Sequence, residues 1–165
     1  MNCYTLRYEF SQQFEVPARD AFDWCTDYRA DDWMRMGKKG TRRVARLNDD
    51  TLILTDTVQE VDGAVTKRRL VRLLPRRLAW TNTHLTGPNR HSQFWYRIVS
   101  EGRLRSRLEF TGLQVNYGPS PTAARAARMA QALRDDDAGM WALLAEEMSK
   151  DPGRPRAPSR RARKT

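Results

Sequence analysis

The sequence has few cysteines, few histidines and no long hydrophobic run. Its two cysteines, Cys3 and Cys25, are too few for a disulfide scaffold or for a zinc site built from thiolates. No stretch approaches the roughly 18 consecutive apolar residues of a membrane span, and the N-terminus does not read as a signal peptide. The sequence therefore predicts a cytoplasmic protein.

Several catalytic and nucleotide-binding motifs are also missing. The chain contains no Gly-x-Ser-x-Gly elbow, no cysteine at a recognisable spacing from a histidine, no Gly-x-Gly-x-x-Gly and no P-loop. Its two histidines, His84 and His91, would lie within about 7 Å of each other if residues 87–90 close a hairpin. Zinc and iron sites need three protein ligands, so we expect neither a metal nor another cofactor.

Positive charge is plentiful, and half of the net charge lies at the C-terminus. Residues 151–165 hold six Arg or Lys against one Asp, which accounts for +5 of the net charge of +10. Prolines exclude a helix there, and no residue is suited to a core. We therefore divide the chain into a folded domain, residues 1–149, and a disordered basic tail, residues 150–165. Such a tail can bind nucleic acid or an anionic membrane. A solubilising role is favoured, because net charge alone does not identify a partner.

Hydrophobic periodicity predicts an α+β domain. Residues 4–14 alternate between apolar and polar side chains, as a half-buried strand does, and two short helices should follow at 18–25 and 30–36. Beyond them the turns are short, so consecutive strands should pair as antiparallel hairpins. The six further strand-like runs are 41–47, 51–60, 64–73, 77–86, 91–100 and 103–115.

A long amphipathic helix is expected from Pro121 to Met148, with Ser120 as its N-cap. Its apolar residues recur at helical period. They are Ala126, Met129, Ala130, Leu133, Met140, Trp141, Leu144 and Met148. At ~1.5 Å per residue such a helix is about 40 Å long, enough to cover the apolar face of a whole sheet.

This order of elements resembles the helix-grip fold of the START-like, polyketide cyclase/dehydrase (SRPBCC) superfamily. The residues that carry the resemblance are Val16, Pro17, Ala18, Phe22, Asp27 and Trp33. It covers about residues 4–148 and implies a curved, antiparallel, seven-stranded sheet wrapped on the C-terminal helix. It also implies a cavity between sheet and helix for an apolar or amphipathic ligand. The superfamily includes carriers and enzymes, so the resemblance does not choose an activity.

Large side chains on the inferred inner faces are the candidates for lining a ligand. We expect the ligand-binding residues to be Tyr8, Phe10, Trp80, His84, Phe94, Tyr96, Phe110, Asp137 and Trp141. A buried carboxylate facing a histidine could transfer protons, because burial and the partner's charge move both pKa values toward neutrality. The weak catalytic candidates on this ground are His84, Asp137 and Asp56. Asp137 also fits a solvated run of three aspartates, so both interpretations stay open.

The favoured function is binding of a hydrophobic or amphipathic small molecule, such as a lipid or an aromatic or polyketide-like compound. His84 and Asp137 would orient its polar group. The first alternative is a cyclase/dehydrase-type enzyme in which a pocket histidine or aspartate transfers a proton. The second is a module that binds a partner or nucleic acid through the basic tail.

Overall fold

The computed structural model describes residues 2–151, so most of the tail expected at 150–165 lies outside the described residues. Within these residues the α-helices are α1 (Ala18–Thr26), α2 (Asp32–Arg35) and α3 (Ala123–Lys150). The strands are β1 (Cys3–Phe14), β2 (Gly40–Arg46), β3 (Thr51–Glu60), β4 (Gly63–Leu74), β5 (Ala79–His84), β6 (Gln93–Ser100) and β7 (Ser106–Tyr117). Among these described helices, none is long and apolar enough to cross a membrane.

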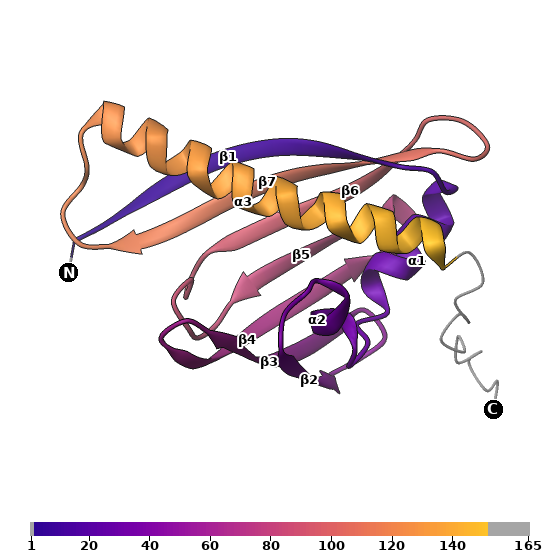
Figure 1. The fold of residues 1–165 in the computed structure, drawn as a ribbon, viewed down its shortest axis with the longest axis horizontal. Coiled ribbons are helices and arrows are strands. Elements are labelled where there is room, and N and C mark those ends of the chain that lie inside the picture. Colours follow the sequence, from indigo (N-terminus) through magenta and orange to yellow (C-terminus); the bar gives the residue numbers. More distant parts are fainter. Residues whose placement is uncertain (1, 152–165) are drawn as a thin grey trace.

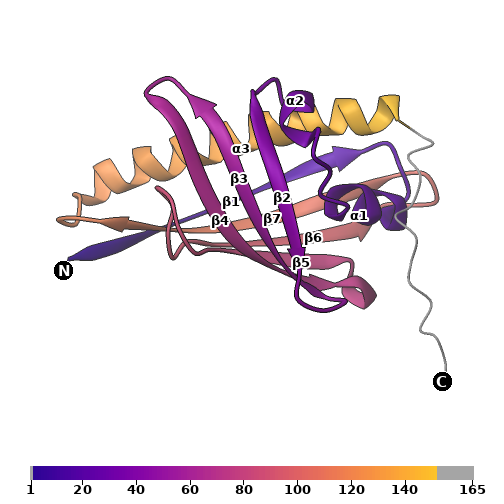
Figure 2. The ribbon, with the colours of Figure 1, turned by 90° about the horizontal axis from the view of Figure 1, so that it is seen from below.

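All seven strands form one antiparallel sheet in the order β1-β7-β6-β5-β4-β3-β2. Strands β2 to β7 follow one another as a meander, and β1 pairs with β7, so that the first and last strands are neighbours. The sheet is strongly twisted: β2–β4 run steeply across the direction of β6 and β7 (Figure 2). Helix α3 extends along β1 and β7, and α1 lies beside its C-terminal end (Figure 1).

Several strand ends differ by one to three residues from the sequence-based expectation, most of all in β5 and β7. Strand β5 begins at Ala79 instead of residue 77, because residues 75–77 form a 3₁₀ turn that opens with Pro75 and ends at Leu78 with a φ of 47°. Strand β7 begins at Ser106, after a turn that contains Gly102.

The expected cap of the long helix was wrong. Helix α3 is capped by Thr122, whose Oγ1 accepts a hydrogen bond from the Arg125 amide at 3.4 Å. The helix therefore begins two residues later than predicted, since the hydroxyl that receives a free helical N–H belongs to Thr122.

The core lies between the inner face of the sheet and α3. Within it, the rings of Trp80 and Tyr96 stack with centroids 4.7 Å apart. Trp141 of α3 reaches this stack, with its ring centroid 5.8 Å from that of Tyr96 and 6.3 Å from that of Trp80. The two buried side chains of α3, Trp141 and Met148, both lie in its C-terminal half. Aromatic packing near that end therefore fixes the helix on the sheet.

Candidate ligand-binding site

The inner face becomes polar over β3, β4 and β5. Hairpin register places Arg69 opposite Leu54 on one side and His84 on the other, and Val71 lies opposite Asn82. Arg69, Asn82 and His84 are therefore neighbours on two adjacent strands and point to the same side of the sheet. The aromatic core continues from them, because Asn82 pairs across with Phe94.

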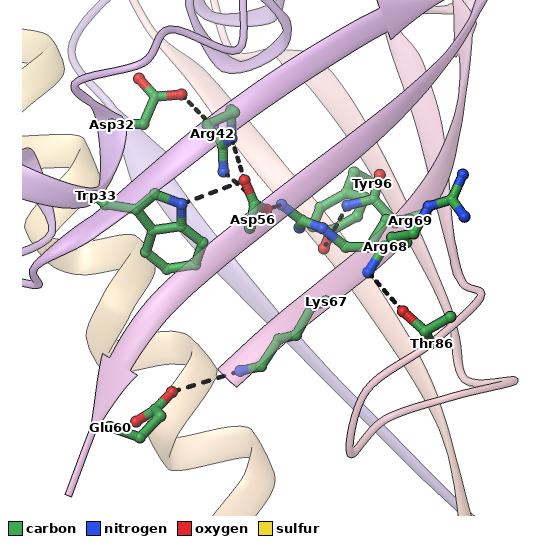
Figure 3. A network of polar contacts seen from close by, with 11 residues as sticks. Asp32, Trp33, Arg42, Asp56, Glu60, Lys67, Arg68, Arg69, Thr86 and Tyr96 are labelled. Carbon is green, nitrogen blue, oxygen red and sulfur yellow. Dashed lines mark hydrogen bonds and ion pairs between the residues drawn. The ribbon is translucent and has the colours of Figure 1, made fainter. Parts of the chain in front are cut away.

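A buried ion-pair network lies next to this region (Figure 3). Its centre is Asp56, whose side chain is 1% exposed. The Arg42 guanidinium donates to Asp56 Oδ1 at 2.7 Å, Trp33 Nε1 donates to the same oxygen at 3.2 Å, and Arg69 Nη2 donates to Oδ2. Arg42 also pairs with Asp32, so the network joins β2, β3 and β4 to α2.

These contacts determine the charge of Asp56. Burial alone would raise its pKa, but Arg69, Arg42 and the Trp33 hydrogen bond outweigh that effect and hold the pKa below its usual value. Asp56 is therefore ionised at neutral pH, and its oxygens are already occupied. Removing one member of such a buried pair costs about 3–5 kcal/mol, which suits an anchor of the structure more than a proton donor.

Four polar atoms beside the network are buried without a hydrogen-bond partner among residues 2–151. They are Arg69 Nε, Tyr28 OH, Asn82 Oδ1 and His84 Nδ1. The charge of Arg69 acts on Tyr28, on His84 and on Tyr96, whose hydroxyl accepts a 3.4 Å hydrogen bond from Asn82 Nδ2. An unpaired buried polar atom costs about 1–3 kcal/mol, so a set of them marks a place that a hydroxyl, carbonyl or acidic group can occupy with a gain.

His84 is held in its neutral form. Burial, with Arg69 and Lys67 nearby, lowers its pKa to about 3, although Asp56 opposes the shift. Its ring meets that of Phe94 edge-on, with centroids 5.1 Å apart. At neutral pH one ring nitrogen of the imidazole can donate a hydrogen bond and the other can accept one. The ring does not carry the second proton that a general acid would give to a ligand.

A second polar contact joins the helix to the sheet. Tyr8 OH on β1 donates to Asp137 Oδ2 on α3 at 2.6 Å. Burial raises the pKa of Asp137, and Asp136 adds to the rise, while the Tyr8 hydrogen bond opposes it. Burial and the Asp137 charge also raise the pKa of Tyr8. Asp137 is thus the carboxyl in this region that protonates most readily, and it projects from α3 onto Tyr8 rather than onto the arginines.

The structure brings the nine predicted ligand-binding residues to the inner side of the molecule. Asp137 is half-buried and the other eight are buried. It does not pair His84 with Asp137, however, because the charges that act on His84 are those of Arg69, Lys67 and Asp56. The apolar members form a continuous cluster: Tyr8, Phe10, Trp80, Phe94, Tyr96, Phe110 and Trp141.

The two histidines also separate. The side chain of His91 is exposed and bonds to the Tyr117 hydroxyl, whereas His84 points into the core. Within the described part of the chain, no group of three or more His, Cys, Asp or Glu residues is placed to hold a metal ion.

Sequence reasoning missed Arg69, Arg42 and Tyr28. For Arg69 a signal was present, because it alternates in phase with Val71 and so belongs on the inner face of its strand. The hairpin turn then sets it diagonally from Asp56, an opposite charge on the same face. Tyr28 follows α1 in an irregular segment, for which periodicity carries no signal.

Comparison with known proteins shows which fold the chain has. No model of a known protein family matches the sequence, and no curated protein matches it. Among solved structures, the Zhui aromatase/cyclase from Streptomyces sp. R1128 is similar with a TM-score of 0.70 and 16% identity, over 90% of this chain and 96% of that one. Ara h 8.0201 has a TM-score of 0.66 and 11% identity, over 90% of this chain and 99% of that one.

A START superfamily protein from Mycobacterium smegmatis has a TM-score of 0.64 and 17% identity, over 86% of this chain and 98% of that one. With identities this low, the likeness is one of fold. The order of strands, the two short helices after β1 and the long C-terminal helix agree with it. The chain therefore has the helix-grip fold of the START-like, polyketide cyclase/dehydrase (SRPBCC) superfamily, as the sequence resemblance predicted.

Proposed function

We propose that the protein binds an amphipathic, largely apolar small molecule between α3 and the inner face of the sheet. The polar end of this ligand lies at Arg69, Asn82, His84 and Tyr28, and its apolar part lies against the aromatic cluster. The observation that carries the proposal is the set of four buried polar atoms without partners on one side of that cluster.

The donor and acceptor character of these atoms indicates which functional groups the ligand carries. Arg69 Nε is a donor, Asn82 Oδ1 is an acceptor, and the neutral His84 ring and the Tyr28 hydroxyl can serve as either. A phenol, an enol or a carboxylic acid satisfies such a set better than a purely hydrocarbon ligand. Affinity comes mainly from the apolar part, since each 100 Å² of apolar surface buried contributes about 2.5 kcal/mol.

Native mass spectrometry of the protein purified from its own source is the direct test. We expect a bound apolar or aromatic compound that is released on denaturation and that raises the melting temperature of the emptied protein when it is added back. A protein that is empty and shows no thermal shift with fatty acids, sterols or hydroxylated polycyclic aromatics contradicts the proposal.

A matched pair of substitutions on β5 tests the site itself. Asn82→Leu keeps the shape of a buried side chain and removes the polar atoms, so we expect a loss of affinity of about tenfold, as for a hydrogen bond to a charged or well-placed polar group. Thr83→Val makes a similar polar-to-apolar change at the next residue, on the opposite face of the sheet, and should leave affinity unchanged. Equal effects of the two substitutions would place the ligand elsewhere.

Proton-transfer catalysis of the cyclase/dehydrase kind is the second candidate. It is supported by the Tyr8–Asp137 hydrogen bond of 2.6 Å and by the fold shared with an aromatase/cyclase. Asp137, with its raised pKa, would take a proton from a carbon next to a ligand carbonyl and return it to the departing oxygen. Turnover of a linear poly-β-ketone analogue that is lost in Asp137→Asn, with ligand binding retained, would support this activity; unchanged turnover in that variant would exclude this role.

A further inference from the structure

The outer face of the sheet, opposite the ligand site, carries a one-sided charge. The outward positions of β2 to β6 hold four arginines, Arg43, Arg68, Arg72 and Arg97, and no aspartate or glutamate. The other outward residues are mostly threonine and small or aliphatic side chains. Arg77, at the 3₁₀ turn before β5, is exposed beside them.

A hollow of about 630 Å³ opens on this face. It is lined by Arg77, Ala79, Trp95, Arg97, Glu109 and Thr111. Trp95 is 44% exposed, which is unusual for the largest side chain on a sheet surface. The volume of the hollow is in the range of small-molecule sites, so it can take a planar group that contacts the indole.

The charges around the hollow are not balanced. Glu109 is neutralised by ion pairs with Arg97 at 2.6 Å and with Arg107 at 3.2 Å. By contrast, the guanidinium groups of four exposed arginines form no ion pair within residues 2–151: Arg43, Arg68, Arg72 and Arg77. The face therefore presents a net positive field next to an exposed aromatic ring.

Sheet geometry sets the spacing of these groups. Arg72 lies in register with Thr81, and Thr81 with Trp95, so Arg72 and the tryptophan are two strands apart, or roughly 10 Å. Arg68 is four residues from Arg72 on the same strand, or about 13 Å. The cations thus form a row that leads away from the tryptophan and continues along β4.

We propose that this outer face binds single-stranded nucleic acid. One base stacks on Trp95 in the hollow, and backbone phosphates contact Arg77, Arg72 and, further along the sheet, Arg68. An aromatic platform beside a row of unpaired cations is the combination by which proteins hold unpaired strands. A membrane-binding face would instead need a continuous apolar surface to enter the lipid, and here threonines and arginines interrupt the outward aliphatic residues.

Fluorescence anisotropy with the full chain and a labelled oligo-dT or oligo-U of about 12 nucleotides tests the proposal. We expect binding at about 50 mM salt that weakens steeply by about 200 mM. Arg68→Glu with Arg72→Glu should lower affinity at least about tenfold and reduce the salt slope by roughly 1.4, for two lost phosphate contacts. Trp95→Ala should lower it at least about fivefold, and Trp95→Phe should restore most of the loss.

The matched control is Arg125→Glu with Arg128→Glu, which makes the same change in net charge at two exposed positions of α3. It should weaken binding less than about twofold. Equal losses in the two double variants would show that only net charge matters, and no loss in the sheet variant would assign binding to residues outside the sheet. Either result, or binding to phosphatidylserine vesicles but not to the oligonucleotides, overturns the proposal.

Discussion

His84 is a histidine whose surroundings keep it uncharged. In the unfolded chain its pKa is about 6.5, whereas burial and the nearby Arg69 and Lys67 lower it to about 3 in the native protein. Between these two values the unfolded state binds the extra proton and the native state does not. Stability therefore falls as the pH drops below about 6.5, by about 1.4 kcal/mol per pH unit from this residue alone.

Replacing His84 by Gln should remove that dependence. We expect the free energy of unfolding, measured with urea at pH 6, 5 and 4, to fall less steeply in His84→Gln than in the parent, by about 1.4 kcal/mol per unit. Some acid sensitivity remains, because the pKa of Asp56 is lowered as well and its ion pairs are lost on protonation. The same substitution at the exposed His91 is the control. Identical slopes for His84→Gln and the parent would refute the account.

At the scale of single elements, two glycines should respond to alanine with opposite signs. Gly112 on β7 lies under the Tyr8 ring, and an added Cβ would come within 2.6 Å of its Cζ atom. Gly139 lies within α3, and nothing approaches an added Cβ there within 4 Å. A side chain at position 112 would therefore collide with Tyr8, whereas glycine at position 139 only lowers the helix propensity of α3.

Urea denaturation checks this contrast. Gly112→Ala should destabilise by about 1–3 kcal/mol, since β7 or Tyr8 must shift and the Tyr8–Asp137 hydrogen bond is strained. Gly139→Ala should stabilise by about 0.5–1 kcal/mol through helix propensity alone. A neutral Gly112→Ala would mean that Tyr8 moves freely, and the helix would then be held on β1 less firmly than its contacts indicate.

At the scale of the whole molecule, we expect residues 2–151 to account for the free energy of unfolding of the full chain. Residues 152–165 contribute six basic side chains and no large apolar residue, so their sequence has nothing to add to a core. Asp151 should be kept, because it forms an ion pair with Arg35 at 3.4 Å.

Calorimetry of a chain that ends at Asp151 measures this. The free energy of unfolding should stay within about 0.5 kcal/mol of the full-length value, as for surface changes in general. A loss of more than about 1 kcal/mol would show that the terminal residues pack on the domain, and the proposed boundary at residue 149 would be wrong.

Sequence alone determined the fold and the inner face. The alternation of Leu6, Tyr8 and Phe10 with polar residues, and the apolar stripe that includes Trp141, identify which side chains are buried. Because the turns between consecutive strands are short, these strands are expected to pair as antiparallel hairpins. These signals are local, which is why they can be recognised from one sequence.

Only the tertiary structure decided which polar groups meet. Asp56 faces Arg42 and Arg69 instead of a histidine, and Asp137 bonds to Tyr8 across more than a hundred residues of sequence. Such pairs depend on strand register, sheet twist and the direction of long side chains. None of these produces a periodic pattern in the sequence. A buried charge needs a partner, and which partner is near enough depends on how the strands pair and how α3 packs on the sheet.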